Sequence, residues 1–398
     1  MTYRAQMMAA LTGESCESIP WAPRMDLWYI AQRERGTLPP DLVKATISDI
    51  AKKYGFACHA VRGDYTRTQA PEANKLRGIG FENHPDFPCR FELRDLPIEY
   101  SLEGEETITR IETSSGPVVF HLKFSGSMRT GGISLPFKLR YAVEEPDDLA
   151  RVAELFEHLE IVPAKEAFSE FRSEIGEEGV AVAHASIAAS PIHLLLHELM
   201  PMDLFFFWYH DRYRELKEFE ERVTPFFDSL IDVVCDSGAD VALWGANFDR
   251  DLTWPPFFDR DIAPWLMKVK NRFHTAGILL LCHTDGENSK MFDSYAKVGF
   301  DVAESVCARP MTELSLLEQR KGLGDEVAIW GGIPSVLLLA DSVSDEAFIS
   351  YLESLERDLR LLAPNASRLI LGVSDNVPPD AKIDRLNRIS EWVSNIRM

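Results

Sequence analysis

A histidine and an aspartate two residues apart, His283 and Asp285, follow a short apolar run in the segment AGILLLCHTDG (residues 276–286). In an extended chain, side chains two positions apart lie on the same side of the backbone. An imidazole with a pKa near ~6.5 can protonate a leaving group or bind a metal ion. The pair therefore predicts either an acid with its orienting carboxylate or part of a metal site. The alternative is a hydrogen-bonded structural pair at a strand end.

Other apolar runs in the C-terminal two thirds also end in polar residues or glycine. They are 179–186 with His184, 240–249 with Asn247 and Asp249, 300–307 with Glu304 and Cys307, 326–332 with Gly331 and Gly332, and 368–375 with Ser374 and Asp375. Helical spacers separate these runs, which is typical of a parallel barrel with its site at one rim. We expect an α/β fold, a (β/α)8 TIM barrel, formed by residues 1–398 as a single domain.

An antiparallel β insertion is expected in the N-terminal third, at residues 85–145. Alternating stretches such as TITRIE (107–112) and VVFHLKF (118–124), with glycine and serine between them, predict hairpins packed on or beside the barrel. Before the insertion, residues 19–29 (IPWAPRMDLWY) are interpreted as the first barrel strand with its rim.

Composition excludes several classes of partner. The 398 residues include 42 Lys+Arg and 63 Asp+Glu, a net charge of −21, which argues against nucleic acid and anionic membranes. No run approaches the roughly 18 apolar residues of a membrane span, and the early run 7–11 lacks the apolar core of a signal peptide. The six cysteines form no CxxC pair, which suits reduced thiols in a cytoplasmic protein.

Four groups of segments, in their order and spacing, resemble the uroporphyrinogen decarboxylase superfamily, particularly its corrinoid-dependent methyltransferase branch. They are PRMDLWY (23–29) with GTLP (36–39), GAN (245–247) with residues 254–258, HTAG (274–277) running into HTDG (283–286), and LGVSDNVPP (371–379). The resemblance covers most of the chain and implies a (β/α)8 barrel.

The resemblance also implies a methyl transfer to or from the cobalt of a corrinoid (cobalamin) held by a separate protein. Thiol-methylating members bind zinc through a His-x-Cys pair and a distal Cys. Here His283 is followed by Asp285, and Asp375 stands where the distal Cys would fall, so an oxygen-rich set replaces soft thiolates. With Cys307 as a further candidate ligand, these residues are the predicted metal set. The alternatives are an Asx turn at Asp375 and an inert thiol at Cys307.

Substrate contacts are expected from two other segments. Asn247 matches a rim position of the superfamily, and Arg24 with Asp26 is expected to form a salt bridge at the rim or to bind a carboxylate or ring substituent. Trp254 and Phe257 lie in the loop after Asn247, where flat aromatic walls would suit an aryl substrate.

Two other motifs receive structural interpretations. His193 and His197 are four residues apart, but their helix is largely apolar and Glu198 lies off that face, so no metal pair is predicted. The aromatic cluster 205–209 is interpreted as core packing or an interface, compatible with a homodimer.

The leading prediction is an O-demethylating methyltransferase that takes a methyl group from a small donor, most plausibly an aryl methyl ether, and passes it to a Co(I) corrinoid on a partner protein. His283 with Asp285, and a zinc ion if one binds, would activate the leaving group. The first alternative is a decarboxylase in which Arg24 binds a carboxylate and Asp26 or Asp285 protonates the carbanion. The second is a non-catalytic corrinoid or tetrapyrrole binder.

Overall fold

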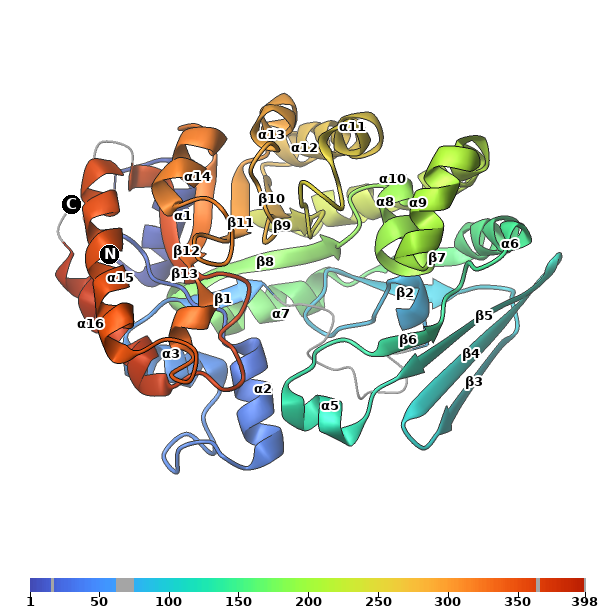
Figure 1. Cartoon of the computed structure of the whole chain (residues 1–398). Coiled ribbons are helices and arrows are strands. Elements are labelled where there is room, and N and C mark those ends of the chain that lie inside the picture. Colours follow the sequence, from blue (N-terminus) through green and yellow to red (C-terminus); the bar gives the residue numbers. More distant parts are fainter. Residues whose placement is uncertain (16–17, 62–74, 363–365, 397–398) are drawn as a thin grey trace.

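The computed structural model describes residues 1–15, 18–61, 75–362 and 366–396. Its centre is a seven-stranded sheet in which every pairing is parallel (Figure 1). In spatial order the strands are β1 (Cys58–Val61), β8 (Gly179–Ser186), β9 (Val241–Trp244), β10 (Leu279–His283), β11 (Val302–Val306), β12 (Ala328–Ile333) and β13 (Leu369–Val373). The predicted α/β class is confirmed, six of the predicted runs are strands of this sheet, and β1 at its edge is the seventh strand.

Helices connect and cover these strands. They are α1 (Tyr3–Thr12), α2 (Asp26–Arg35), α3 (Ile47–Tyr54), α6 (Pro146–Glu157), α7 (Lys165–Ile175), α8 (Pro191–Leu194), α9 (Met202–Asp211), α10 (Tyr213–Cys235), α11 (Pro255–Phe257), α12 (Ala263–Thr275), α13 (Phe292–Val298), α14 (Leu316–Leu323), α15 (Asp345–Leu362) and α16 (Ile383–Asn395). In the part of the chain that the structure describes, none of the helices has the length and apolar character that crossing a membrane requires.

The sheet is curled into a half-barrel, because an edge strand and an inner strand meet across its interior. His59 of β1 and Glu304 of β11 are hydrogen bonded at 3.0 Å, although β8, β9 and β10 separate their strands in the sheet. Side chains alternate between two packing layers, as period-two strands require. Val180 and Val182 lie in the inner cluster, whereas Ala181 belongs to the outer cluster that packs against helices.

The prediction of a complete eight-stranded barrel is not met in the described residues. Trp21 forms only a single parallel bridge with Leu371 of β13, and its carbonyl accepts a hydrogen bond from Ala57 beside β1 at 2.7 Å. Pro20 and Pro23 lack the N–H groups that a longer ladder needs. The interpretation of residues 19–29 as a strand is therefore wrong beyond this bridge, since helix α2 begins at Asp26.

The antiparallel insertion is present and lies on the side of the molecule away from both termini (Figure 1). It contains a four-stranded sheet of β3 (Ile98–Glu103), β4 (Glu106–Thr113), β5 (Gly116–Lys123) and β6 (Phe137–Arg140), with helix α5 (Gly126–Gly131) before β6. A separate pair joins β2 (Cys89–Leu93) to β7 (Leu159–Pro163). In this pair β2 lies within the predicted insertion, 85–145, and β7 lies after it in the chain.

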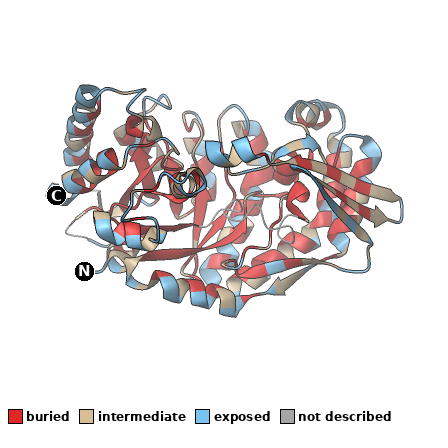
Figure 2. Ribbon diagram, turned by 90° about the horizontal axis from the view of Figure 1, so that it is seen from below, coloured by how far each residue is buried: buried red, intermediate tan, exposed pale blue. Residues whose placement is uncertain are grey.

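Helix α1 packs against the inner side of the half-barrel. Met7, Ala10 and Leu11 belong to the inner cluster together with Val180 and Leu281. Figure 2 shows buried residues concentrated in the central strands and exposed residues on the outer helices and the insertion. The strands thus have apolar cover on both faces, which is the environment parallel sheets require.

We expect Leu11→Ala to lower the free energy of unfolding by about 2–5 kcal/mol, because it leaves a cavity inside the half-barrel. The matched control is Leu361→Ala, because the Leu361 side chain is 69% exposed whereas that of Leu11 is 1% exposed. The control should change stability by less than about 0.5 kcal/mol. Urea unfolding of both variants measures the difference, and equal midpoints would show that α1 does not contribute to the inner core.

Candidate active site

The inward-facing positions of the strands end in polar side chains at one end of the half-barrel. In β10 the inward series continues from Leu281 to His283, and in β11 from Val302 to Glu304. His283 and Glu304 are also direct partners in the parallel register of these two strands. Neighbouring strands therefore place an imidazole beside a carboxylate at the end of the apolar interior.

Glu304 is the buried centre of the site. Its side chain is only 2% exposed, and its two oxygens accept hydrogen bonds from His59 Nε2 at 3.0 Å and His283 Nδ1 at 2.5 Å. Burial opposes ionisation, but the charge and hydrogen bond of His283, together with His59, hold the pKa of Glu304 below its usual range. Burial lowers the pKa of His59 although Glu304 opposes this, so His59 is the neutral donor of the pair.

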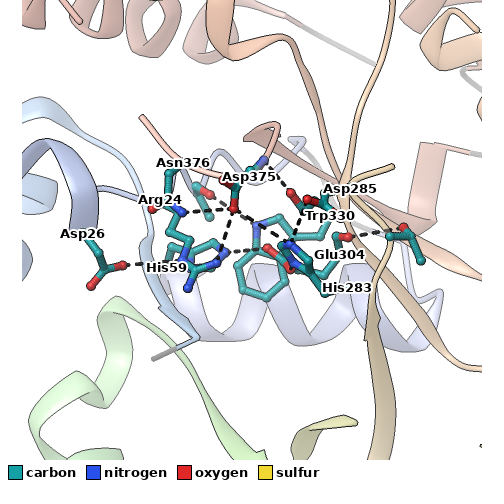
Figure 3. Close-up of polar contacts among 12 residues, drawn as sticks. Arg24, Asp26, His59, His283, Asp285, Glu304, Trp330, Asp375 and Asn376 are labelled. Atoms are coloured by element: carbon teal, nitrogen blue, oxygen red, sulfur yellow. Dashed lines mark hydrogen bonds and ion pairs between the residues drawn. The ribbon is translucent and has the colours of Figure 1, made fainter. Parts of the chain in front are cut away.

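Three carboxylates, those of Glu304, Asp285 and Asp375, surround His283 (Figure 3). Its Nε2 lies 3.6 Å from Asp285 Oδ2 and 3.8 Å from Asp375 Oδ1, on the side of the ring opposite Glu304. Burial disfavours the charged imidazole, but Glu304 and Asp285 outweigh it and raise the pKa of His283 well above its ordinary value. Its Nε2–H is consequently a proton donor at neutral pH.

Arg24 completes the charge balance on the other side of Asp375. Its Nη1 lies 3.7 Å from Asp375 Oδ1, and its Nε lies 3.7 Å from Asp26 Oδ2 at the start of α2 (Figure 3). The side chains of Arg24 and Asp26 are 6% and 3% exposed, whereas that of Asp375 is 49% exposed. The guanidinium therefore lies behind Asp375, and the carboxylate oxygens are the groups presented to the solvent side.

Three residues of this end adopt left-handed backbone conformations without being glycine. Asn247 has φ 57°, Ser305 has φ 65° and Asp375 has φ 58°. Such conformations are uncommon for residues with a Cβ and persist only where surrounding contacts impose them. One of these contacts joins two of the three residues, because the Asp375 N–H donates a hydrogen bond to Ser305 Oγ. The strained turns redirect the chain so that Asn247 and Asp375 reach the pocket.

A pocket of about 240 Å³ opens over these groups. Ser134 and Leu135 of the insertion contribute to its wall, so the insertion is part of the site as well as an addition beside the half-barrel. The remaining lining residues are Arg24, Leu27, Val61, His184, Ile187, Leu243, Ala246, Asn247, His197, His283, Asp285, Asp375 and Asn376. The apolar part of the wall is aliphatic.

The structure brings most of the sequence-predicted polar residues to this pocket. Arg24, Asn247, His283, Asp285 and Asp375 all line it. Asp26 lies behind Arg24, where it forms the expected rim salt bridge at 3.7 Å.

The two predicted aromatic contacts are placed elsewhere. Phe257 is completely buried, and Trp254 packs 5.0 Å from it, between ring centroids, and 5.5 Å from Phe206. Neither Trp254 nor Phe257 lines the pocket. In the neighbouring cluster Phe205 is buried and Phe207 is 67% exposed. The cluster thus contributes core packing, and a homodimer stays a prediction.

The predicted zinc ligands do not form a recognisable metal site in the described residues. No group of three or more His, Cys, Asp or Glu side chains in the described part of the chain is arranged to hold one. Cys307 is 3% exposed, burial raises the pKa of its thiol to about 11, and it does not line the pocket. Arg24 lies beside the same Asp375 oxygen that a metal would use. Zinc ligation by His283, Asp285, Cys307 and Asp375 stays a prediction.

The sequence predicts no role in the site for Glu304, His59 or His197. Glu304 was recognisable as a polar strand-end residue, but only the barrel curvature brings His59 of β1 onto the same carboxylate. Because the helix of His197 is largely apolar, its sequence predicts no metal pair with His193. Alternate residues of a strand face the same side of the sheet, so residues 302 and 304 share the inward face as 281 and 283 do. This alternation is the sequence signal that could have identified Glu304.

No family model and no curated protein sequence matches this chain. Among solved structures, the chain is similar to a methyltransferase from Methanosarcina mazei, with a TM-score of 0.56 and 13% sequence identity. The match covers 99% of this chain and 98% of that protein. At this identity the similarity establishes a shared fold over the whole length.

We expect Glu304→Gln to make His283 lose its proton at a lower pH than in the native protein. The native pKa of His283 lies above its unfolded value, so the stabilisation is complete below about pH 6.5 and is lost as pH rises through the raised pKa. Removing the Glu304 charge takes away a main cause of the elevation. NMR titration of the His283 ring measures this, with Glu326→Gln as control because that side chain is 93% exposed. An unchanged midpoint in Glu304→Gln would contradict the assignment.

Proposed function

We propose that this protein is a methyltransferase that takes a methyl group from oxygen in a small donor and delivers it to a corrinoid carried by a partner protein. The observation that carries the proposal is the position of His283, a charged imidazole held by Glu304 with its Nε2 directed to a small pocket. An alkoxide or phenolate departs poorly unless it is protonated, so a methyl ether requires an acid of this kind.

In the proposed step the O–CH3 bond breaks and its electron pair remains on oxygen. His283 Nε2–H donates its proton to that oxygen, so the product is an alcohol or phenol and the imidazole becomes neutral. Glu304 remains ionised and holds the ring through Nδ1, and Asp285 and Asp375 flank the proton before transfer. Reprotonation from solvent restores the charged imidazole for the next turnover.

The corrinoid, when a partner protein presents it, supplies the nucleophile that accepts the methyl group. The pocket of about 240 Å³ accommodates a small donor but not a corrinoid ring, so the acceptor would have to approach from the pocket mouth. This geometry is compatible with a cofactor held outside the chain. The chain's own residues bind the donor, exclude water with aliphatic side chains such as Leu243 and Ile187, and supply the proton.

Two further observations support methyl transfer. The full-length similarity to the Methanosarcina mazei methyltransferase is consistent with it. So is the resemblance of the motifs to the corrinoid-dependent branch of the uroporphyrinogen decarboxylase superfamily. Aryl and alkyl methyl ethers are both donor classes to test, because the aliphatic side chains of the pocket wall favour neither of them.

Decarboxylation is less well supported by the charges at the site. A carboxylated substrate would need a cation that is not already compensated. Arg24 lies 3.7 Å from both Asp26 and Asp375, and the two aspartates nearest His283 present negative charge to the pocket. A substrate carboxylate would therefore be repelled at the place where it should bind.

We expect His283→Gln to lower kcat for methyl transfer by about 10²–10⁴-fold, because the leaving oxygen loses its proton donor. His274→Gln is the matched control, since His274 is 43% exposed and paired with Asp301 at 2.8 Å. In the native protein the rate should fall as pH rises through the elevated pKa of His283. Equal rates for the two variants would remove His283 from the mechanism.

The assay uses purified protein with cob(I)alamin as acceptor and a series of methoxyarenes and methoxyalkanes as donors. Formation of the demethylated alcohol or phenol supports the proposal. Release of CO2 from a carboxylated aromatic without methyl transfer would favour the decarboxylase. If neither reaction occurs while the protein binds the corrinoid, the non-catalytic binder is the better interpretation.

A further inference from the structure

A second polar network, formed around Glu198, reaches the pocket through His197 and Asn247. It begins in the π-helical segment Leu195–Leu199, which follows α8. Single π-helical turns inside helices are rare and occur frequently at functional sites. Here the turn places two consecutive residues, His197 and Glu198, in side-chain contact, with His197 Nδ1 and Glu198 Oε1 3.0 Å apart.

Glu198 is ionised although it is buried. Its side chain is 4% exposed, and Lys138 Nζ donates to its Oε2 at 2.5 Å, while Arg77 Nη1 lies 3.7 Å from the same oxygen. Burial disfavours the charge, but Lys138, Arg77 and His197 together lower the pKa of Glu198 well below its usual value. Lys138 also donates to the Glu198 carbonyl at 2.5 Å. It belongs to β6, so the insertion is tied to the half-barrel at this carboxylate.

An ionised Glu198 determines which nitrogen of His197 carries the proton. A carboxylate accepts hydrogen bonds only, so His197 Nδ1 must be the N–H donor. The other ring nitrogen, Nε2, lies 2.5 Å from Asn247 Nδ2, and because an amide nitrogen only donates, Nε2 is the acceptor of this hydrogen bond. The Asn247 amide therefore uses an N–H towards His197, and its other polar atom, Oδ1, is left as an acceptor for the pocket. Asn247 is exposed and lines that pocket.

We propose that Lys138 and Glu198 are positioning residues: by setting the tautomer of His197, they fix Asn247 with its amide oxygen towards the pocket. The methyl donor consequently carries a hydroxyl or N–H group that this oxygen binds. The inference rests on the proposed methyl transfer for its substrate part. The transferred methyl group lies at His283, and the hydrogen-bond donor of the substrate lies at Asn247 on another part of the same wall.

The same arrangement links substrate choice to the insertion. Ser134 and Leu135 line the pocket, and Lys138 follows three residues after Leu135 in the chain. The insertion thus contributes a wall and the cation that orders the network. The left-handed conformation of Asn247, φ 57°, holds the amide at the end of β9, where His197 can reach it.

The first experiment measures the network without activity. NMR of ¹⁵N-histidine-labelled protein reports the tautomer of the His197 ring. We expect a protonated Nδ1 and an unprotonated Nε2 in the native protein, and a larger Nε2–H fraction in Glu198→Gln, because a Gln side chain can also donate to Nδ1. A native ring protonated at Nε2 would overturn the proposal, since Asn247 would then turn its oxygen towards His197.

The second experiment measures substrate choice with two matched pairs of donors, 2-methoxyethanol against 1,2-dimethoxyethane and 2-methoxyphenol against 1,2-dimethoxybenzene. The native protein should prefer the hydroxylated member of the pair that it uses by about tenfold in kcat/KM, since a missing partner leaves a polar group unsatisfied. Lys138→Met and Glu198→Gln should reduce this preference to less than about threefold, mainly through a higher KM for the hydroxylated donor.

Lys123→Met is the matched control. It removes a lysine from the same insertion, but Lys123 is 42% exposed and pairs with Glu106 inside the sheet at 3.6 Å. The Lys123→Met variant should prefer the hydroxylated donor by the same factor in kcat/KM as the native protein does. An unchanged preference in both Lys138→Met and Glu198→Gln would overturn the positioning role. If neither the native protein nor any variant demethylates a donor, the proposed function fails. The NMR measurement of the His197 tautomer still tests whether the network orients Asn247 as proposed.

Discussion

The hydrogen bonds of Glu304 to His59 and His283 are the interaction on which the site depends. They join β1 to β10 and β11 across the interior of the half-barrel, so they hold the curvature of the sheet and the orientation of the imidazole together. A buried carboxylate is unfavourable unless its charge is compensated, and here the compensation is a protonated histidine. The ion pair between Glu304 and His283 therefore keeps Glu304 ionised and also keeps His283 protonated.

The rest of the rim extends this balance of charges. Asp285 and Asp375 stabilise the imidazolium on its pocket side, and Arg24 in turn compensates Asp375 from behind. Carboxylates and cations alternate from Asp26 through Arg24, Asp375 and His283 to Glu304, so removal of one member leaves its neighbour uncompensated. Such alternation explains how several charged groups are accommodated around a pocket whose apolar lining residues are aliphatic.

A comparable arrangement holds the opposite part of the wall. Glu198 is ionised because Lys138 and Arg77 approach it, and this fixes the donor and acceptor atoms of His197. In both networks a buried glutamate sets the state of a histidine. The networks differ in where their cations come from. Glu304 is compensated by His283 of the half-barrel, whereas Glu198 is compensated in part by Lys138 of the insertion. That difference makes the insertion a contributor to the site's chemistry, where the sequence had indicated only a packed addition.

The sequence by itself determined the strands and the polar residues at their ends. Apolar runs of four to eight residues identify buried parallel strands, and their ends were sufficient to name His283, Asp285, Asn247 and Asp375. Only the tertiary structure decided how many strands the sheet contains, that Glu304 meets His59, and that Trp254 and Phe257 pack away from the pocket. The physical reason is that hydrophobic periodicity records local burial. Curvature, charge pairing across the interior and the direction of a loop depend on contacts between residues far apart in the chain.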